Sequence, residues 1–497
     1  MRKYIFLLLT FLSIESRRGI AQQPGDLDNS FGIGGKVVMP QVAWMDVAVQ
    51  PDGKIVAVSH VIARYKTDGT LDSTFATNGI DTIKSGSGIV HCSAVGIQPD
   101  GKILVVGGPV YGNVNLKDFL VLRYNANGSL DSSFDGDGEL VTDFDLGSDD
   151  FGYELAIQTE GKIIVAGASN QKLALCRLHP DGSLDSTFDQ DGKVVINNIT
   201  VDFNNNWSHA TFMKLQADGK IVAGSASLIA RINPDGNMDN SFGTNGLKGL
   251  SAPMNDLAIQ ADGKIALAGG ATTFVIMRLD SNGNYDSGFG LAGMTSTAWT
   301  PGNCSNPRQK ATSILLQPDG RLLAGGYNMC CLLGDCREFV LIRYNSNGSI
   351  DSSFSSDGRV TTNFSGLSTE SRASALTPDR KIVLGGYSYN VDYGAMARYH
   401  LGTMLDVKSA QKLNSHLIVT PNPSHDMVSI KANGIENGIW RMELLDETGR
   451  SVLHETITVN NNSFHKQISL QLFGVGVYFL KLSGATQSMS FKIVKGI

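Results

Sequence analysis

The sequence predicts an all-β protein: a seven-bladed β-propeller of four-stranded blades, followed by a small antiparallel β-sandwich. Two motifs that each recur seven times carry this prediction. In the first motif an Arg follows an apolar run, and its copies are Arg64, Arg123, Arg177, Arg231, Arg278, Arg343 and Arg398. Eight residues later comes the Asp of a Leu-Asp-x-x-Phe-like segment, in the order Asp72, Asp131, Asp185, Asp239, Asp286, Asp351 and Asp406. The second motif, close to Gln-Pro-Asp-Gly-Lys-Ile, starts at Gln50, Gln98, Gln158, Gln216, Gln260, Gln317 and Thr377. A period of about 54 residues indicates a propeller or repeat array rather than independent domains.

Each copy reads as four short strands separated by tight turns. The apolar runs 47–49 and 54–58 flank a Pro-Asp-Gly turn, which is a strong hairpin signal. A third run, Phe119–Tyr124, ends at an Asn-Gly turn, and a fourth run, Glu139–Thr142, follows the Leu-Asp-x-x-Phe segment. No stretch after the N-terminus keeps a 3.6-residue apolar period, so we expect little helix.

The two ends of the array complement each other. The chain enters on what looks like the last strand of a copy, Lys36–Met39, and it leaves on a copy whose fourth strand is missing. We therefore expect Lys36–Met39 to pair beside Ala395–Tyr399 and to close the ring. Closure removes exposed strand edges, which otherwise template aggregation.

Residues that recur in every copy are interpreted as structural. A Gly four residues after the Phe is expected to meet a need for positive φ, and the copies are Gly35, Gly79, Gly138, Gly192, Gly246, Gly293 and Gly358. The Phe residues are expected in the core, and each Arg with its Asp in a partly buried pair. The whole pattern, for example Gln98–Ile103, Arg123–Asn125 and Leu130–Phe134, resembles the delta-60 repeat family of bacterial β-propellers. That resemblance implies a fold and no established activity.

Residues 1–21 have the features of a secretion signal: Arg2 and Lys3, an apolar run and a small-x-small site ending at Ala21. We expect domains at 1–21 (signal peptide), 22–406 (propeller), 407–416 (linker) and 417–497 (sandwich). The net charge of −6 becomes more negative once the signal is removed, which argues against nucleic acid as a partner. We expect no transmembrane segment in the mature chain, no cofactor and no metal ion.

An exported chain can oxidise its cysteines. Four of them cluster in the sixth copy and are candidates for two disulfides: Cys304, Cys330, Cys331 and Cys336. Free thiols and a zinc site are the alternatives, although the usual Cys-x2-Cys spacing of zinc ligands is missing. Cys92 and Cys176 lie in strand runs and are expected to be buried thiols.

The segment 417–497 shows a different β-pattern, with about seven short runs between turn signals. Its ordered motifs are Pro-Asn-Pro, Asp-x-x-Gly-Arg, Gly-Val-Tyr and Lys-Ile-Val-Lys, and their marker residues are Pro421, Asn422, Pro423, Asp446, Gly449, Gly476 and Tyr478. This set resembles the type A C-terminal sorting domain of the Bacteroidetes type IX secretion system. The resemblance implies that the secretion machinery is a partner and that the chain crosses the outer membrane to the cell surface or beyond. An ordinary adhesive sandwich is the alternative.

Ligand binding requires residues that only some copies have, and these gather between the fourth strand of one copy and the Gln motif of the next. The candidates are Trp44, Asp46, His91, Asp150, Trp207, His209, Asp256, Trp299, Glu370 and Arg372. If the Gln-motif strand is innermost, these segments share one face of the disc. Each Trp could stack on a sugar ring or a peptide side chain, or it could seal a gap between blades.

The acidic turns at 135–139 and 143–150 offer oxygen ligands for Ca²⁺, but the full calcium-loop motif is absent and turn formation explains them as well. No nucleophile elbow, zinc-protease motif or phosphate loop occurs, so no catalytic residue is assigned.

Two functions remain open. The first is an exported binding or scaffolding module for an extracellular glycan or protein. The second is a polysaccharide hydrolase or lyase whose acid and base are among Asp46, Asp150, Asp256 and Glu370. Convergence of these four carboxylates to within about 5–9 Å would favour the enzyme.

Overall fold

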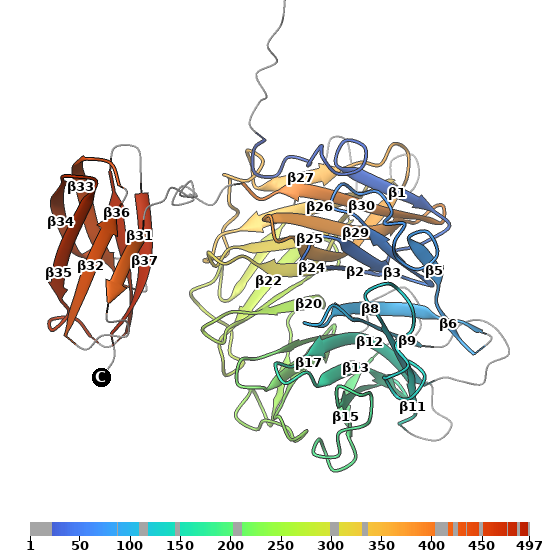
Figure 1. Ribbon diagram of the computed structural model, residues 1–497. Coiled ribbons are helices and arrows are strands. Elements are labelled where there is room, and N and C mark those ends of the chain that lie inside the picture. The colour runs from blue at the N-terminus through green and yellow to red at the C-terminus, as the bar shows by residue number, and fades with distance from the viewer. Residues whose placement is uncertain are drawn as a thin grey trace, which may run out of the picture. The chain divides into compact units, whose positions relative to one another are not determined.

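The computed structural model describes residues 22–86, 88–108, 118–144, 150–201, 211–298, 308–330, 336–402, 416–420, 426–433, 435–446, 451–474, 476–484 and 488–495. Every regular element among these residues is a β-strand (Figure 1). No helix in this part of the chain is long and apolar enough to span a membrane. The chain divides into two compact units at residues 402/403, and each unit is described by itself.

The first unit holds seven four-stranded antiparallel sheets in its described residues. Sheet 1 consists of β2 (Asp46–Val49), β3 (Ile55–Val58), β4 (Val61–Tyr65) and β5 (Ile80–Thr82). Sheet 2 consists of β8 (His91–Ile97), β9 (Ile103–Gly108), β10 (Phe119–Tyr124) and β11 (Glu139–Thr142). Sheet 3 consists of β12 (Asp150–Ile157), β13 (Ile163–Ser169), β14 (Lys172–Leu178) and β15 (Lys193–Thr200). Sheet 4 consists of β16 (Phe212–Leu215), β17 (Ile221–Ser225), β18 (Leu228–Ile232) and β19 (Leu247–Gly249).

Three further sheets complete the series. Sheet 5 consists of β20 (Met254–Ile259), β21 (Ile265–Gly269), β22 (Phe274–Leu279) and β23 (Met294–Thr297). Sheet 6 consists of β24 (Arg308–Leu316), β25 (Leu322–Cys330), β26 (Cys336–Tyr344) and β27 (Arg359–Thr362). Sheet 7 consists of β28 (Thr369–Leu376), β29 (Lys381–Ser388), β30 (Tyr393–His400) and β1 (Lys36–Pro40). A small hairpin of β6 (Lys84–Ser85) and β7 (Gly88–Ile89) lies between sheets 1 and 2 in the sequence.

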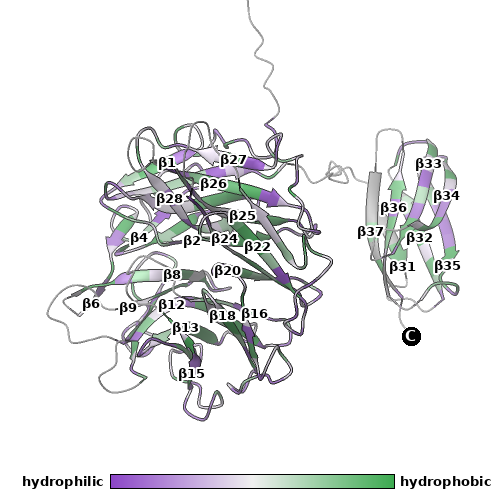
Figure 2. Ribbon diagram, turned by 180° about the vertical axis from the view of Figure 1, so that it is seen from behind, coloured by the Kyte–Doolittle hydropathy of each residue, from purple (hydrophilic) through white to green (hydrophobic). Residues whose placement is uncertain are grey.

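The first strands of the sheets form a closed ring around the propeller axis. Each of β2, β8, β12, β16, β20, β24 and β28 contacts the next, and β28 contacts β2 again. Neighbouring sheets pack face to face: one cluster joins Leu104, Val106 and Val121 of sheet 2 to Val165 and Cys176 of sheet 3. Figure 2 shows the apolar colour on central strands such as β13 and β22, in agreement with the burial of all residues in both strands.

The turns follow from local chemistry. At the first turn of sheet 2, the Asp100 carboxylate accepts a 3.1 Å hydrogen bond from the Lys102 backbone N–H, and Gly101 adopts a φ of 85°. A positive φ is costly for any residue with a Cβ, so the Asp-Gly pair determines where the strand reverses. The predicted Gly residues after the Phe all have positive φ as well, which confirms their expected role.

The N-terminal strand closes the ring, as predicted. β1 pairs with β30 in the register Lys36 with Ala397 and Val38 with Ala395. Just before β1, the Asp28 carboxylate accepts a 2.8 Å hydrogen bond from Nε of Arg398. Sheet 7 therefore combines three strands from one end of the repeat array with one strand from the other.

The C-terminal unit is a sandwich of two antiparallel sheets. One sheet contains β31 (His416–Thr420), β32 (Met427–Asn433) and β35 (Ser463–Ser469), and the other contains β34 (Ser451–Val459), β33 (Gly438–Leu445), β36 (Gly476–Ser483) and β37 (Ser488–Lys495). Its core includes Val428, Ile430, Trp440, Leu444 and Leu480. The predicted all-β fold class, a propeller followed by a sandwich, is confirmed.

Candidate functional site

The topology separates the repeated residues from the variable ones. In a four-stranded meander, the connections between strands one and two and between strands three and four lie at one end of the sheet. The connection between strands two and three lies at the other end, together with the crossover to the next sheet. We call the first end the turn end and the second the loop end. The Gln motifs and the Leu-Asp-x-x-Phe segments occupy the turn end, whereas the variable connections occupy the loop end.

Each sheet has an Arg–Asp pair at its turn end, and we call this pair the clamp. In six sheets the Arg donates from Nε to the Asp eight residues later, at 2.6–2.9 Å. The expected pairing of Arg398 with Asp406 is wrong: Arg398 pairs with Asp28 instead, and Asp406 lies outside the described residues. The reason is the split copy, because the strand that follows Arg398 in space is β1. The predicted Arg–Asp contacts are otherwise confirmed.

A third charge completes the clamp, and the sequence analysis missed it. The Lys or Arg of the second motif also reaches each Asp, as Lys102 does with Asp131 at 2.9 Å. Burial works to raise the pKa of Asp131, but hydrogen bonds from Lys102 and Ser133 and the charge of Arg123 hold that pKa well below its usual value. The cation lies four residues after the first residue of the second motif in all seven copies, so the signal was present in the sequence.

The axial cluster is the first group of residues that do not recur from sheet to sheet. Four charged residues from sheets 1, 3, 4 and 5 meet at the axis: Asp46, Glu154, Lys214 and Asp256. Nζ of Lys214 lies 3.1 Å from Glu154 Oε1 and 3.6 Å from Asp256 Oδ1. The Lys214 side chain is 39% exposed, so the cluster is open to the axial cavity.

The carboxylates of the axial cluster also connect neighbouring sheets. Asp46 accepts a 2.8 Å hydrogen bond from the backbone N–H of Val95 in sheet 2. Asp256 accepts a 2.8 Å hydrogen bond from the backbone N–H of Ile314 in sheet 6. Burial and the charge of Glu154 raise the pKa of Asp46 to about 7. Asp46 can therefore exchange a proton near neutral pH.

The axial cavity beside this cluster has a volume of about 100 Å³. Buried hydroxyls of Thr211 and Ser313 line it and have no hydrogen-bond partner among the described residues. Such a cavity holds several waters, whereas pockets for sugar- or drug-sized ligands measure roughly 300–1,000 Å³. The axial cavity is therefore too small for a polysaccharide chain.

The arginine–tyrosine cluster is the second group that breaks the repeat, and it lies at the loop end between sheets 6 and 7. It comprises Arg337, Glu370, Arg372, Tyr387 and Tyr389. Arg337 donates from Nη1 to Glu370 Oε2 at 2.6 Å, and Arg372 donates from Nη2 to Glu370 Oε1 at 2.8 Å. The hydroxyl of Tyr387 lies 2.5 Å from Glu370 Oε1 and 2.6 Å from Arg372 Nη2.

One face of this cluster reaches the surface. The guanidinium carbon of Arg337 lies 3.6 Å from the ring centroid of Tyr389, which is a close cation–π contact. Tyr389 is 57% exposed, whereas Glu370 is only 2% exposed. Burial works to raise the pKa of Glu370, but the charges of Arg372 and Arg337 keep it below its usual value. Glu370 is thus a buried anion that holds two cations, and one of them, Arg337, also contacts the exposed ring of Tyr389.

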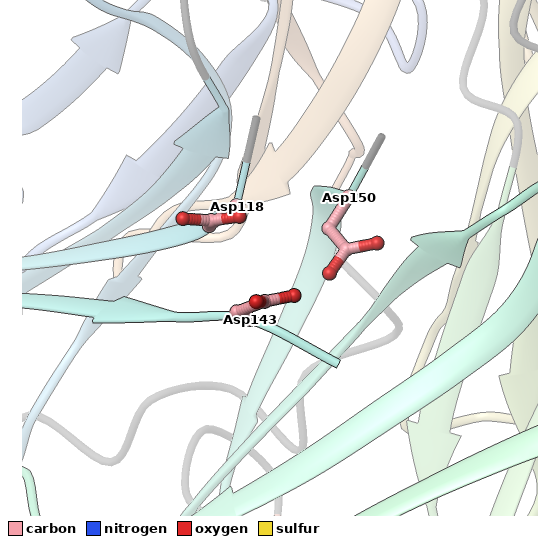
Figure 3. Close-up of side chains that lie close together, drawn as sticks. All are labelled: Asp118, Asp143 and Asp150. Atoms are coloured by element: carbon pink, nitrogen blue, oxygen red, sulfur yellow. The ribbon is translucent and has the colours of Figure 1, made fainter. Parts of the chain in front are cut away.

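A third group consists of Asp118, Asp143 and Asp150, at the loop end of sheets 2 and 3. Figure 3 shows the three carboxylates close together, and one oxygen of each lies within 4.8 Å of the others. Burial and the charges of Asp143 and Asp150 raise the pKa of Asp118. Oxygen ligands of this kind could hold a Ca²⁺ ion, although Asp150 also accepts a 2.8 Å hydrogen bond from the Phe144 backbone.

The structure distributes the predicted ligand residues over several places. Trp44 is fully buried and packs edge-on against Tyr65, so it presents no face to a ligand. His91 lies at the loop end with its ring centroid 5.8 Å from that of His60. The remaining three aromatic candidates, Trp207, His209 and Trp299, lie outside the described residues.

The four carboxylates that would mark an enzyme fall into three different groups. Asp46 and Asp256 share the axial cluster, Asp150 belongs to the aspartate group, and Glu370 belongs to the arginine–tyrosine cluster. Sequence reasoning missed Glu154, Lys214 and Arg337, because each of them lies inside a strand run rather than in a variable connection.

Some of the predicted cysteine and sorting-motif residues lie outside the described residues. Cys304 and Cys331 lie outside the described residues, and Cys330 and Cys336 are opposite each other in the β25–β26 pair. Cys92 and Cys176 are buried free thiols. Pro421, Asn422, Pro423 and Gly449 lie outside the described residues, Asp446 follows β33, and Gly476 begins β36. Tyr478 is buried and donates to the Gly474 carbonyl at 2.8 Å.

Comparisons with known proteins agree with this architecture. The family model described as "Domain of unknown function (DUF5122) beta-propeller" matches residues 50–75, 98–134, 158–188, 216–242, 260–289 and 317–354. The model described as "Secretion system C-terminal sorting domain" matches residues 419–496. No curated protein sequence matches the chain significantly.

Solved structures show only distant likeness. The extracellular domain of a hybrid two-component system from B. thetaiotaomicron is 12% identical, with a TM-score of 0.42, and the match covers 92% of this chain and 56% of that one. A protein from Lactobacillus plantarum is 10% identical, with a TM-score of 0.39 and coverages of 87% and 99%. Drosophila Semaphorin 1b, extracellular domains 1-2, is 9% identical, with a TM-score of 0.37 and coverages of 76% and 88%.

The two family matches confirm both resemblances that the sequence motifs indicated. The sorting domain directs export across the outer membrane, to the cell surface or the extracellular space. The chain therefore contains DUF5122 β-propeller repeats and, over residues 419–496, a secretion-system C-terminal sorting domain.

Proposed function

We propose that the mature protein is a binding module for an extracellular glycan and that its loop end contains the binding site. One observation carries the proposal: the exposed ring of Tyr389 with the Arg337 guanidinium held against it at 3.6 Å. Aromatic faces and guanidinium donors are the groups with which a protein can contact both the apolar face and the hydroxyls of a sugar ring.

This arrangement is ordered before any ligand arrives. Glu370 is buried and holds Arg337 and Arg372 through hydrogen bonds of 2.6 and 2.8 Å. A site whose side chains are already fixed loses less conformational entropy on binding. A few convergent polar groups next to an aromatic surface are also typical of small-ligand sites.

The enzyme alternative receives less support from the geometry. The raised pKa of Asp46, about 7, suits a general acid near neutral pH. However, both oxygens of Asp46 accept backbone hydrogen bonds, from Val47 and Val95, and the adjacent cavity is too small for a sugar chain. Hydrogen bonding of this kind is what a structural carboxylate between two sheets requires.

A glycan array probed with the full mature chain tests the proposal. We expect binding to a subset of glycans, and Tyr389→Ala should reduce the affinity for them about tenfold or more. Tyr285→Ala is the matched control, because Tyr285 is a 36% exposed ring with the Lys248 ammonium 4.2 Å away, but at the turn end. Equal losses in both variants, or no glycan bound at all, would contradict the proposal.

A further inference from the structure

Lys310 introduces a charge next to the arginine–tyrosine cluster that nothing in the described chain neutralises. It lies in β24 opposite Tyr327 of β25, is half-buried, and has neither a hydrogen bond nor a salt bridge among the described residues. Burial and the charge of Arg372 lower the pKa of its ammonium, and Glu370 only partly offsets this effect. Lys310 of β24 therefore lies close enough to Arg372 of β28 for the two positive charges to repel each other.

Arg372 supplies a second, independent observation. The residue is 9% exposed, and its Nη2 donates to Glu370 and Tyr387. Its Nε, in contrast, is buried without a hydrogen-bond partner among the described residues. The neighbouring hydroxyl of Ser371 is also buried without a partner. A buried donor that stays unpaired destabilises the folded protein, so such donors are expected to have a partner in the functional state.

The charge balance indicates the sign of that partner. Arg337 and Arg372 both donate to the carboxylate of Glu370, and Lys310 is a third cation near enough for the charges of Arg372 and Glu370 to act on it. An anionic group would pair with the excess cations, whereas a neutral hydroxyl would leave them uncompensated. Ion-assisted hydrogen bonds are about twice as strong as neutral ones.

We infer that the loop end binds an acidic glycan and that Lys310 and Arg372 recognise the carboxylate of a uronic acid residue. The inference rests on the proposed glycan-binding function and adds the class of sugar. A carboxylate has two oxygens in one plane, so it can accept from the Lys310 ammonium and offset the neighbouring positive charge of Arg372. The exposed ring of Tyr389 lies on the same cluster and is available to the sugar ring.

The test compares three soluble polymers on the full mature chain by calorimetry: polygalacturonate, the same polymer with its carboxyl groups reduced to alcohols, and dextran sulfate. We expect polygalacturonate to bind about tenfold or more tightly than the reduced polymer. Lys310→Met should remove most of this difference and leave the affinity for the reduced polymer unchanged. Lys172→Met is the matched control, since Lys172 is half-buried at the loop end of sheet 3, and it should leave both affinities unchanged.

The remaining outcomes separate the inference from the function on which it rests. Equal affinity for the acidic and the reduced polymers would overturn the carboxylate inference and leave glycan binding intact. Lys310-dependent binding of dextran sulfate as tight as that of polygalacturonate would show that the site selects charge alone, which also overturns it. If no polymer binds and the glycan array is blank, the proposed function fails as well. Unchanged melting temperatures of both lysine variants exclude misfolding as a cause.

Discussion

Asp28 and Arg398 are 370 positions apart in the chain, yet Oδ2 of the first accepts a 2.8 Å hydrogen bond from Nε of the second. In every other sheet the equivalent pair is eight residues apart. Lys381 joins the same carboxylate at 2.8 Å. The clamp that stabilises a single sheet elsewhere therefore joins the two ends of the propeller here.

Asp28→Ala should destabilise the propeller by about 3–5 kcal/mol, because it leaves the buried Arg398 without its anion and weakens the attachment of β1. Urea unfolding of the mature chain measures this change. Asp26→Ala, at an exposed position two residues earlier, is the control and should alter the free energy of unfolding little. Similar stabilities of the two variants would contradict a closing role for the pair.

Asp185→Ala tests the clamp within one sheet. The side chains of Asp185 and Arg177 are 1% and 6% exposed, so removing the carboxylate leaves a buried guanidinium without a counter-ion. We expect a loss of about 3–5 kcal/mol in the free energy of unfolding. Asp181→Ala removes an exposed turn carboxylate of the same segment and serves as the control. A loss no larger than that of the control would show that the clamp contributes little.

Asp46 should make stability depend on pH in the direction opposite to the clamp carboxylates. Its pKa is about 7 in the folded chain against 3.8 in the unfolded chain, so between these values the folded state retains more protons. The free energy of unfolding should therefore fall as pH rises from about 4 to 7. Asp46→Asn cannot titrate and should flatten this slope, as measured by urea unfolding at several pH values. An unchanged slope would refute the assignment.

The clamp carboxylates should dominate acid unfolding. Cations and hydrogen bonds hold the pKa values of Asp28, Asp131, Asp185 and Asp239 below their usual value despite burial. Their contribution to stability is present above about pH 4 and is lost as pH falls toward the folded-state pKa values. A melting temperature that stays constant between pH 5 and pH 2, about the range in which these carboxylates take up protons in the unfolded chain, would contradict this.

Lys214→Met should destabilise the propeller most at neutral and alkaline pH, because Glu154 and Asp256 would face each other without their shared cation. Protonation of these carboxylates at lower pH removes the repulsion, so the deficit in melting temperature should shrink as pH falls. Lys172→Met, a half-buried lysine of β14, is the control. A deficit that does not vary with pH would indicate lost packing rather than lost charge.

The sorting domain should be dispensable for folding of the propeller. The chain divides into separate compact units at 402/403, so a chain ending at residue 409 should melt cooperatively. In a host that carries the secretion system, this shortened chain should accumulate in the periplasm, because the sorting domain is missing. Fractionation of the cells measures the outcome, and normal surface display would refute the sorting role.

The loop-end sites were only partly predictable. Asp46, Asp256, Glu370 and Arg372 stand out in the sequence because they break the repeat. Their partners Glu154, Lys214 and Arg337 lie in strand runs that look like the other copies. Trp44 was open to two interpretations, a ligand contact or a seal between blades, and it is a core residue against Tyr65.

The sequence by itself determined what is local and repeated: the strands, the Asp-Gly turns, the Arg–Asp pairs at separation eight, and the sorting motifs. These features depend on spacing along the chain, so they can be read without knowing what lies across the axis. The tertiary structure decided which residues of different sheets meet, including Lys214 with Glu154 and Arg337 with Glu370. Such contacts join positions 60 and 33 residues apart, and only the closing of seven sheets around one axis brings them together.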